Sequence, residues 1–270
     1  MVVQHNLSAM NTNRQMGVVT SALQKSTEKL SSGYKINRAG DDAAGLSISE
    51  KMRSQIRGLN KASDNAQDGI SLIQVAEGAL NETHSILQRM NELATQAAND
   101  TNTSVDRQSI KDEIEQLNEE LDRISTTTQF NKQDLLTGGF SGKLQVGALE
   151  GQTMDVKISL AVSAKGLKVS AVEVSTNVKA GAAMKSIQDA IESVSKQRSK
   201  LGAIQNRLEH TINNLDTNAE NTQAAESRIR DTDMADEMVQ YSKNNILSQA
   251  GQSMLAQANQ QTQGVLSLLG

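Results

Sequence analysis

One stretch decides the fold of this chain: residues 41–99 read DDAAGLSISEKMRSQIRGLNKASDNAQDGISLIQVAEGALNETHSILQRMNELATQAAN. It contains no proline, and its apolar residues recur at alternating spacings of three and four, the period of an amphipathic helix. The first stripe consists of Met52, Ile56, Leu59, Ala66, Ile70, Ile73, Leu80, Leu87 and Ala94. A second, adjacent stripe consists of Leu72, Ala76, Ala79, Ile86, Met90, Leu93 and Ala97. Two adjacent stripes predict one long helix that several neighbours cover, as in a bundle.

The composition favours long helices packed along narrow seams over a compact globular core. The 270 residues include 1% aromatics and 37% hydrophobic residues, and both proline and cysteine are absent. Without cysteine there is no disulfide and no thiolate site. The net charge of −4 comes without a basic patch, so the chain gives no case for a nucleic-acid partner. No secretory signal and no apolar run of roughly 18 residues stands out, so we expect no cleavable signal and no membrane span.

The predicted organisation is nearly symmetrical about a small β region. Residues 1–40 form a weak amphipathic segment and a glycine-rich break, and residues 41–130 form the long helix and a second helix from about 104 to 128. Residues 131–180 form a small β region: apolar and polar side chains alternate over 154–162, Leu144 and Val146 belong to the antiparallel partner strand, ALEGQT forms the hairpin turn, and a third short strand is expected at 167–171. Helix resumes over 181–230, and a second weak segment covers 231–270. The predicted fold class is mainly α: a long antiparallel helical rod, coiled-coil-like, with a small β-hairpin region at its tip and amphipathic terminal helices.

The two terminal segments carry apolar stripes diluted by asparagine, serine and glutamine. Alone, each should be a marginal helix in water. Their apolar positions are Leu7, Met10, Leu23, Leu30, Met234, Met238, Tyr241, Leu247, Leu255, Leu266 and Leu269. One interpretation is a pair of frayed termini. The other is a pair of segments that lie side by side and become ordered only against a partner.

No catalytic or cofactor-binding constellation is found in the sequence. The three histidines are scattered without metal-ligand spacing, and the glycine-rich stretch 138–151 lacks the Gly-Lys-Ser/Thr ending of a phosphate loop. Asp41 and Asp42 are better explained as helix caps than as an acid pair. We therefore predict a protein that is not an enzyme and that uses no cofactor or metal.

Three blocks carry a family resemblance. They are LSSGYKINRAGDDAAGLSISEKMRSQIRGLNKASDNAQDGISLIQVAEGAL at 30–80, LQRMNELATQAANDTNT at 87–103 and SRIRDTDMADEMVQYSKNNILSQAGQSMLAQANQQTQGVLSLL at 227–269. In this order they resemble bacterial flagellin, and the short middle of the chain resembles a form without outer variable domains. The resemblance implies terminal segments that are disordered in the monomer and that polymerise through the apolar positions given above into an extracellular filament for motility. The alternative within this class is a hook–filament junction protein.

The resemblance also implies partners besides other copies of the chain. It implies an export route through the flagellar type III apparatus without a cleavable signal, and a dedicated chaperone that covers the C-terminal segment. LQRMNEL resembles the segment that the host flagellin-sensing Toll-like receptor binds. By residue match the receptor-binding set is Gln88, Arg89, Glu92, Leu93 and Glu113. From the pattern alone, Leu93 belongs to the second apolar stripe and Arg89 to a solvated face. A protease domain, which some flagellins carry, has no room here.

Overall fold

A computed structural model describes the backbone of residues 6–269 and the side chains of residues 6–261. Its helices are α1 (Leu7–Ser32), α2 (Ala43–Ala97), α3 (Ser104–Thr127), α4 (Asn177–Arg230) and α5 (Met234–Leu269). Its strands are β1 (Gln129–Phe130), β2 (Gln133–Asp134), β3 (Phe140–Gln145) and β4 (Thr153–Ile158). The chain divides into a central unit, Gln55–Glu220, and a terminal unit made of the residues up to Ser54 with those from Asn221 onward. The mainly α prediction is confirmed.

The helix boundaries follow local capping chemistry. The Asp42 carboxylate accepts a hydrogen bond of 2.9 Å from the backbone N–H of Gly45 and so caps the start of α2. At α3, the Thr103 side chain accepts from the Asp106 N–H while the Asp106 carboxylate accepts from the Thr103 N–H, which forms a capping box. Gly33, with φ of 76°, ends α1 in the left-handed conformation that favours glycine. The predicted cap at Asp42 and the predicted second helix are therefore confirmed.

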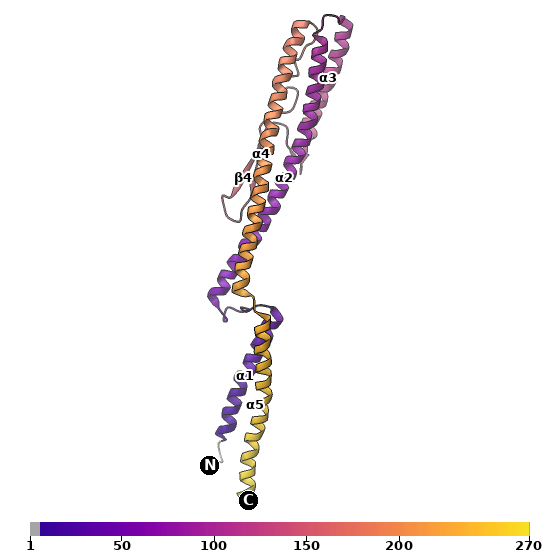
Figure 1. Ribbon diagram of the computed structural model, residues 1–270. Helices are drawn as coiled ribbons and strands as arrows, with labels where there is room; N and C mark the ends of the chain where they lie inside the picture. The colour runs from indigo at the N-terminus through magenta and orange to yellow at the C-terminus, as the bar shows by residue number, and fades with distance from the viewer. Residues whose placement is uncertain (1–5, 270) are drawn as a thin grey trace. The chain divides into compact units, whose positions relative to one another are not determined.

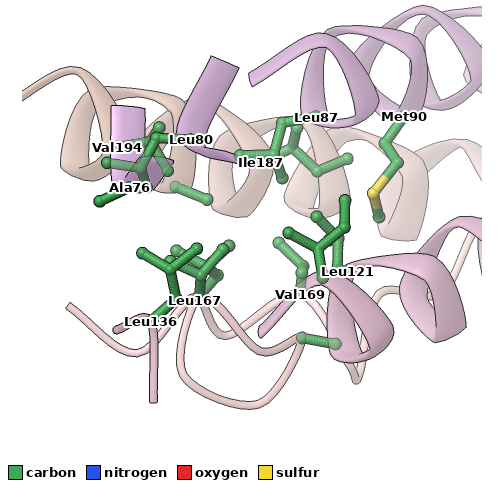
Figure 2. Close-up of a cluster of buried hydrophobic side chains, with 14 of the residues drawn as sticks. Ala76, Leu80, Leu87, Met90, Leu121, Leu136, Leu167, Val169, Ile187 and Val194 are labelled. Carbon is green, nitrogen blue, oxygen red and sulfur yellow. The ribbon is translucent and has the colours of Figure 1, made fainter. Parts of the chain in front are cut away.

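The central unit is an antiparallel helical bundle. Asn177 Nδ2 bonds the Ala98 carbonyl at 2.7 Å, and Ser63 Oγ bonds Asp216 Oδ1 at 3.0 Å, so α4 runs antiparallel to α2. The Arg89–Glu113 and Arg107–Ala97 contacts place α3 antiparallel to α2 as well. Figure 2 shows side chains from all three helices and from the loops around Leu136 and Leu167 meeting in one core. Both stripes of the long helix pack in this core from Ala66 onward, as the sequence predicts, whereas Leu59 belongs to a second, smaller cluster.

The β region lies beside α2 and not at the tip of the bundle, so that part of the prediction is wrong. β3 pairs with β4 in antiparallel register, from Phe140 opposite Ile158 to Gln145 opposite Thr153. The Gln145 carbonyl accepts from Asn65 Nδ2 at 3.1 Å, and a Cβ on Gly58 would lie 2.8 Å from that of Ala148. The reason is topological: α3 returns along α2 before the strands begin.

Residues 163–172 form turns, so the third strand predicted at 167–171 is also wrong. The Asp122 carboxylate of α3 accepts from the Ala164 N–H at 2.8 Å, and the Val169 N–H bonds the Ala164 carbonyl at 2.9 Å. These bonds curl the segment so that Leu167 and Val169 both point into the core. Two side chains separated by two positions would share one face of a strand too, which is why the pattern did not discriminate.

Candidate functional site

The terminal unit contains the paired helices α1 and α5, which lie side by side (Figure 1). Lys29 contacts Glu237, a Cβ on Gly251 would lie 3.9 Å from the Met16 Cβ, and Asn6 Nδ2 bonds the Ala258 carbonyl at 2.9 Å. In these three contacts the residue number on α5 increases as the residue number on α1 decreases, so the helices are antiparallel. The prediction that the two terminal segments lie side by side is confirmed.

The contact between these helices follows a heptad pattern, which we call the α1/α5 seam. Its shielded positions are Ala9, Thr12, Met16, Val19, Leu23, Ser26 and Leu30 on α1, and Glu237, Tyr241, Asn244, Ser248, Gly251, Leu255 and Ala258 on α5. Seams of stable coiled coils carry branched apolar residues at most of these positions. Here small and polar residues occupy about half of the seam, so the two helices bury little apolar surface against each other.

Large apolar residues of the pair lie outside the seam instead. We call them the outer apolar set: Leu7, Met10, Val18, Met234, Met238, Val239, Ile246, Leu247 and Met254, all exposed. Val239 and Ile246 are one heptad apart on the side of α5 that faces away from α1. These residues contrast with the large apolar side chains of the central unit, most of which lie in its core.

The terminal unit has little interior of its own. Among the residues whose side chains the structure describes, its buried apolar side chains are Ile36 and Ala258. Both apolar clusters of the described chain, the large core and a small one at Leu59, Ala62, Leu215 and Ala219, belong to the central unit. The outer apolar set, in contrast to the seam residues, therefore has no core of the terminal unit to pack into among the described residues.

A polar junction within the terminal unit joins the segment after α1, the first turns of α2 and the last turns of α4. The guanidinium of Arg230, 12% exposed, lies 4.8 Å from the Tyr34 ring centroid and 2.9 Å from Glu50 Oε1. Ser49 Oγ, which is buried, donates to Glu226 Oε1 at 2.7 Å. The Lys35 N–H bonds the Arg230 carbonyl at 2.6 Å. These contacts hold the chain segment after α1 against the end of α4.

A second candidate surface lies on α2 and α3 in the central unit. Arg89 donates to Glu113 Oε1 at 2.9 Å and to Glu92 Oε2 at 3.3 Å, and all three side chains are exposed. The carboxylate of Glu113 raises the pKa of Arg89, and Glu92 adds to the effect. Gln88 is exposed beside them and contacts His84 at 3.0 Å. Leu93, in contrast, is 2% exposed and packs in the core.

The predicted polymerisation residues fall into three groups. Leu7, Met10, Met234, Met238 and Leu247 belong to the outer apolar set. Leu23, Leu30, Tyr241 and Leu255 lie in the α1/α5 seam. The side chains of Leu266 and Leu269 lie outside the described residues.

The predicted polymerisation residues do not include four members of the outer apolar set: Val18, Val239, Ile246 and Met254. The heptad spacing of Val239 and Ile246 is a signal that could have found two of them. Over the described helices, none is long and apolar enough to cross a membrane. Among the residues that could be searched, no group of three or more metal-ligating side chains comes together.

The chain is similar to known proteins at both ends and along its length. Residues 3–141 match the family model described as the bacterial flagellin N-terminal helical region, and residues 184–269 match that of the C-terminal helical region. The chain is 56% identical to a flagellin of Halalkalibacterium halodurans and 52% identical to one of Bacillus subtilis, with both chains of each pair fully covered.

Solved structures agree with this relationship. The crystal structure of Bacillus cereus flagellin is 33% identical and matches 60% of this chain and 94% of its own, with a TM-score of 0.51. A putative flagellar hook-associated protein from Vibrio parahaemolyticus gives a TM-score of 0.62 over 71% of this chain and 100% of its own. At 14% identity, that second likeness extends to the fold alone.

Proposed function

Because the chain belongs to the bacterial flagellin family, a family of structural filament proteins, we propose that it assembles through its paired terminal helices into the extracellular flagellar filament. One observation carries this proposal. The outer apolar set is exposed on a unit that has almost no core, while most of the apolar stripe residues of the central unit are buried. Copies packed around a common axis would cover the outer apolar set with the same set of their neighbours.

We further propose that ordering of α1 and α5 accompanies assembly. Fixing the backbone of one residue costs about 1–2 kcal/mol of conformational entropy. A seam filled largely with small and polar side chains offsets little of that cost in a lone chain. In the filament, burial of the outer apolar set adds the missing stabilisation, so that folding and binding are coupled. The paired helices described above are then the assembled form.

The test compares the free subunit with the polymer. The helicity measured by far-ultraviolet circular dichroism should rise on seeded polymerisation. The residues up to about 30 and beyond about 240 should lose their sensitivity to protease. Deleting either segment should leave a folded central unit that makes no filaments in electron micrographs. Filaments from either truncated chain, or terminal segments that resist protease in the dilute monomer, would contradict the proposal.

We propose that the subunit reaches the filament through the flagellar export apparatus without a cleaved signal, with a chaperone on its C-terminal segment. The exposed residues Met238, Val239, Ile246 and Met254 support a chaperone, because an uncovered apolar helix face promotes aggregation before assembly. The full-length identity to flagellins favours the filament subunit over the junction protein. Electron microscopy of the seeded chain distinguishes the two, since a junction protein would not extend long filaments.

A second candidate function is recognition by the host flagellin-sensing Toll-like receptor. The supporting observation is that Arg89, Glu92 and Glu113 form an exposed ion-pair cluster across two packed helices, with Gln88 adjacent. Leu93 would contribute by packing α2 in place, since its side chain does not reach the surface.

Receptor signalling by Arg89→Ala tests the second function. Arg123→Ala is a matched control, because Arg123 also pairs with an acidic neighbour, Glu120, on an exposed helix face. Signalling by the Arg89 variant at the level of the control would remove Arg89 from the receptor site.

A further inference from the structure

The α1/α5 seam does not define its own alignment through packing. Ser26, Asn244, Ser248, Gly251 and Ala258 are small or polar, and a slide of one heptad would place Ser26 opposite Ser248 and Met16 opposite Ala258 without a steric clash between large side chains. Repeats of this sort permit alternative registers unless one position singles out the correct pairing. Something other than the shape of the seam must therefore choose the register.

One ion pair, between Glu237 of the seam and Lys29 at its edge, is well placed to do so. Lys29 Nζ lies 3.3 Å from Glu237 Oε2, and the Glu237 side chain is only 6% exposed. Lys29 is in the last turn of α1 and Glu237 is in the first turn of α5, so each charge also faces the helix end that favours it. A carboxylate buried to this degree is strongly destabilising if its partner moves away.

We propose that the Lys29–Glu237 ion pair sets the register of α1 against α5 and is thus a positioning element for filament assembly. A slide of one heptad, about 10 Å along the helices, would place Lys29 beside Asn244 and leave the buried Glu237 carboxylate without its cation. The pair therefore excludes wrong alignments more than it strengthens the right one, as buried polar groups do in other helical seams. The inference rests on the proposed function in that correct alignment presents a single outer apolar set to neighbouring copies.

The absence of cysteine allows the register to be measured in the full-length chain. Met16→Cys with Gly251→Cys reports the native register, because the two Cβ atoms would be 3.9 Å apart, within disulfide range. Met16→Cys with Ala258→Cys reports a slide of one heptad, because those positions meet only after the slide. Disulfide yields are read in seeded polymer, and filament formation by each reporter chain is scored separately by electron microscopy.

In each reporter background we compare Lys29→Glu, Glu237→Lys, both together, and Lys243→Glu. The Lys243 variant changes the net charge equally on an exposed position of α5 outside the seam. We expect Lys29→Glu to lower the ratio of native to slipped disulfide by at least about tenfold, and the double exchange to restore part of the loss. Recovery should be incomplete, because the exchanged charges oppose the helix dipoles. Lys243→Glu should leave the ratio unchanged.

A neutral variant separates alignment from helix stability. Lys29→Ala with Glu237→Ala raises helix propensity and removes both charges. The proposal expects slipped disulfide to appear in seeded polymer of this variant, with helicity retained. The proposal would be overturned if the neutral variant formed only the native disulfide. It would also be overturned if the double exchange gave no higher ratio of native to slipped disulfide than either single change. Failure of the parent reporter chains to form filaments would instead count against the proposed function.

Discussion

Truncating Ile246 to alanine should weaken assembly without weakening the folded subunit. Ile246 is 66% exposed, so about two-thirds of its side chain remains to be buried by a neighbouring copy. The substitution removes roughly three carbon groups, each worth about 0.8 kcal/mol on full burial, which gives a loss of about 1.5 kcal/mol. That loss corresponds to roughly a tenfold rise in the critical concentration for polymerisation.

The measurement is seeded polymerisation followed by sedimentation over a range of subunit concentrations. Alanine is a better helix former than isoleucine, so weaker assembly would not reflect a weaker helix. Val105→Ala serves as the control, since Val105 is an exposed apolar residue on α3 in the central unit. A critical concentration for Ile246→Ala that stays within about twofold of the parent would refute the assignment of this face to assembly.

Three further predictions address other parts of the chain. Leu93→Ala should destabilise the central unit by about 2–5 kcal/mol in urea unfolding, because Leu93 is fully packed, whereas Arg89→Ala should change stability by less than about 1 kcal/mol. Arg230→Ala should speed hydrogen exchange at the Lys35 and Thr232 amides, which bond the carbonyls of Arg230 and Gly33; unchanged exchange would show that Arg230 does not hold this junction. The hydrogen bonds that Asp106 accepts from the Thr103 hydroxyl and N–H hold its pKa below the ordinary value, so its contribution to stability is present above the unfolded pKa and is lost as pH falls through the folded pKa. Asp106→Asn should therefore flatten the acid limb of the stability–pH profile, and an unaltered limb would contradict the capping role.

The helices could be predicted from the sequence because their apolar stripes are local and long. The spacing of Ile73, Leu80 and Leu87 predicts that they share one face of a helix, and all three side chains are buried. The placement of the hairpin beside α2 could not be predicted, because it depends on contacts such as Asn65 with Gln145 that no local pattern encodes. Two-residue strands such as β1 and β2 are too short to produce an alternation at all.

The sequence predicts an interaction surface on the terminal segments, but it does not separate the two faces of each helix. Leu255 in the seam and Leu247 outside it are both leucines on the same weak stripe. Only the partner helix decides which of them is shielded. The Lys29–Glu237 pair could not be predicted either, because its members are 208 positions apart in the sequence and single charged residues usually belong to a solvated face.

Both apolar clusters lie in the central unit. Defects in that unit and defects in α1 and α5 are therefore detected by different screens. A damaging substitution at Leu80 harms each molecule on its own, so a screen for soluble expression would discard it. A substitution at Ile246 passes the same screen, and its defect is detected only when subunits assemble. Libraries of this protein will therefore retain functional defects in α1 and α5 unless variants are also screened for incorporation into growing polymer.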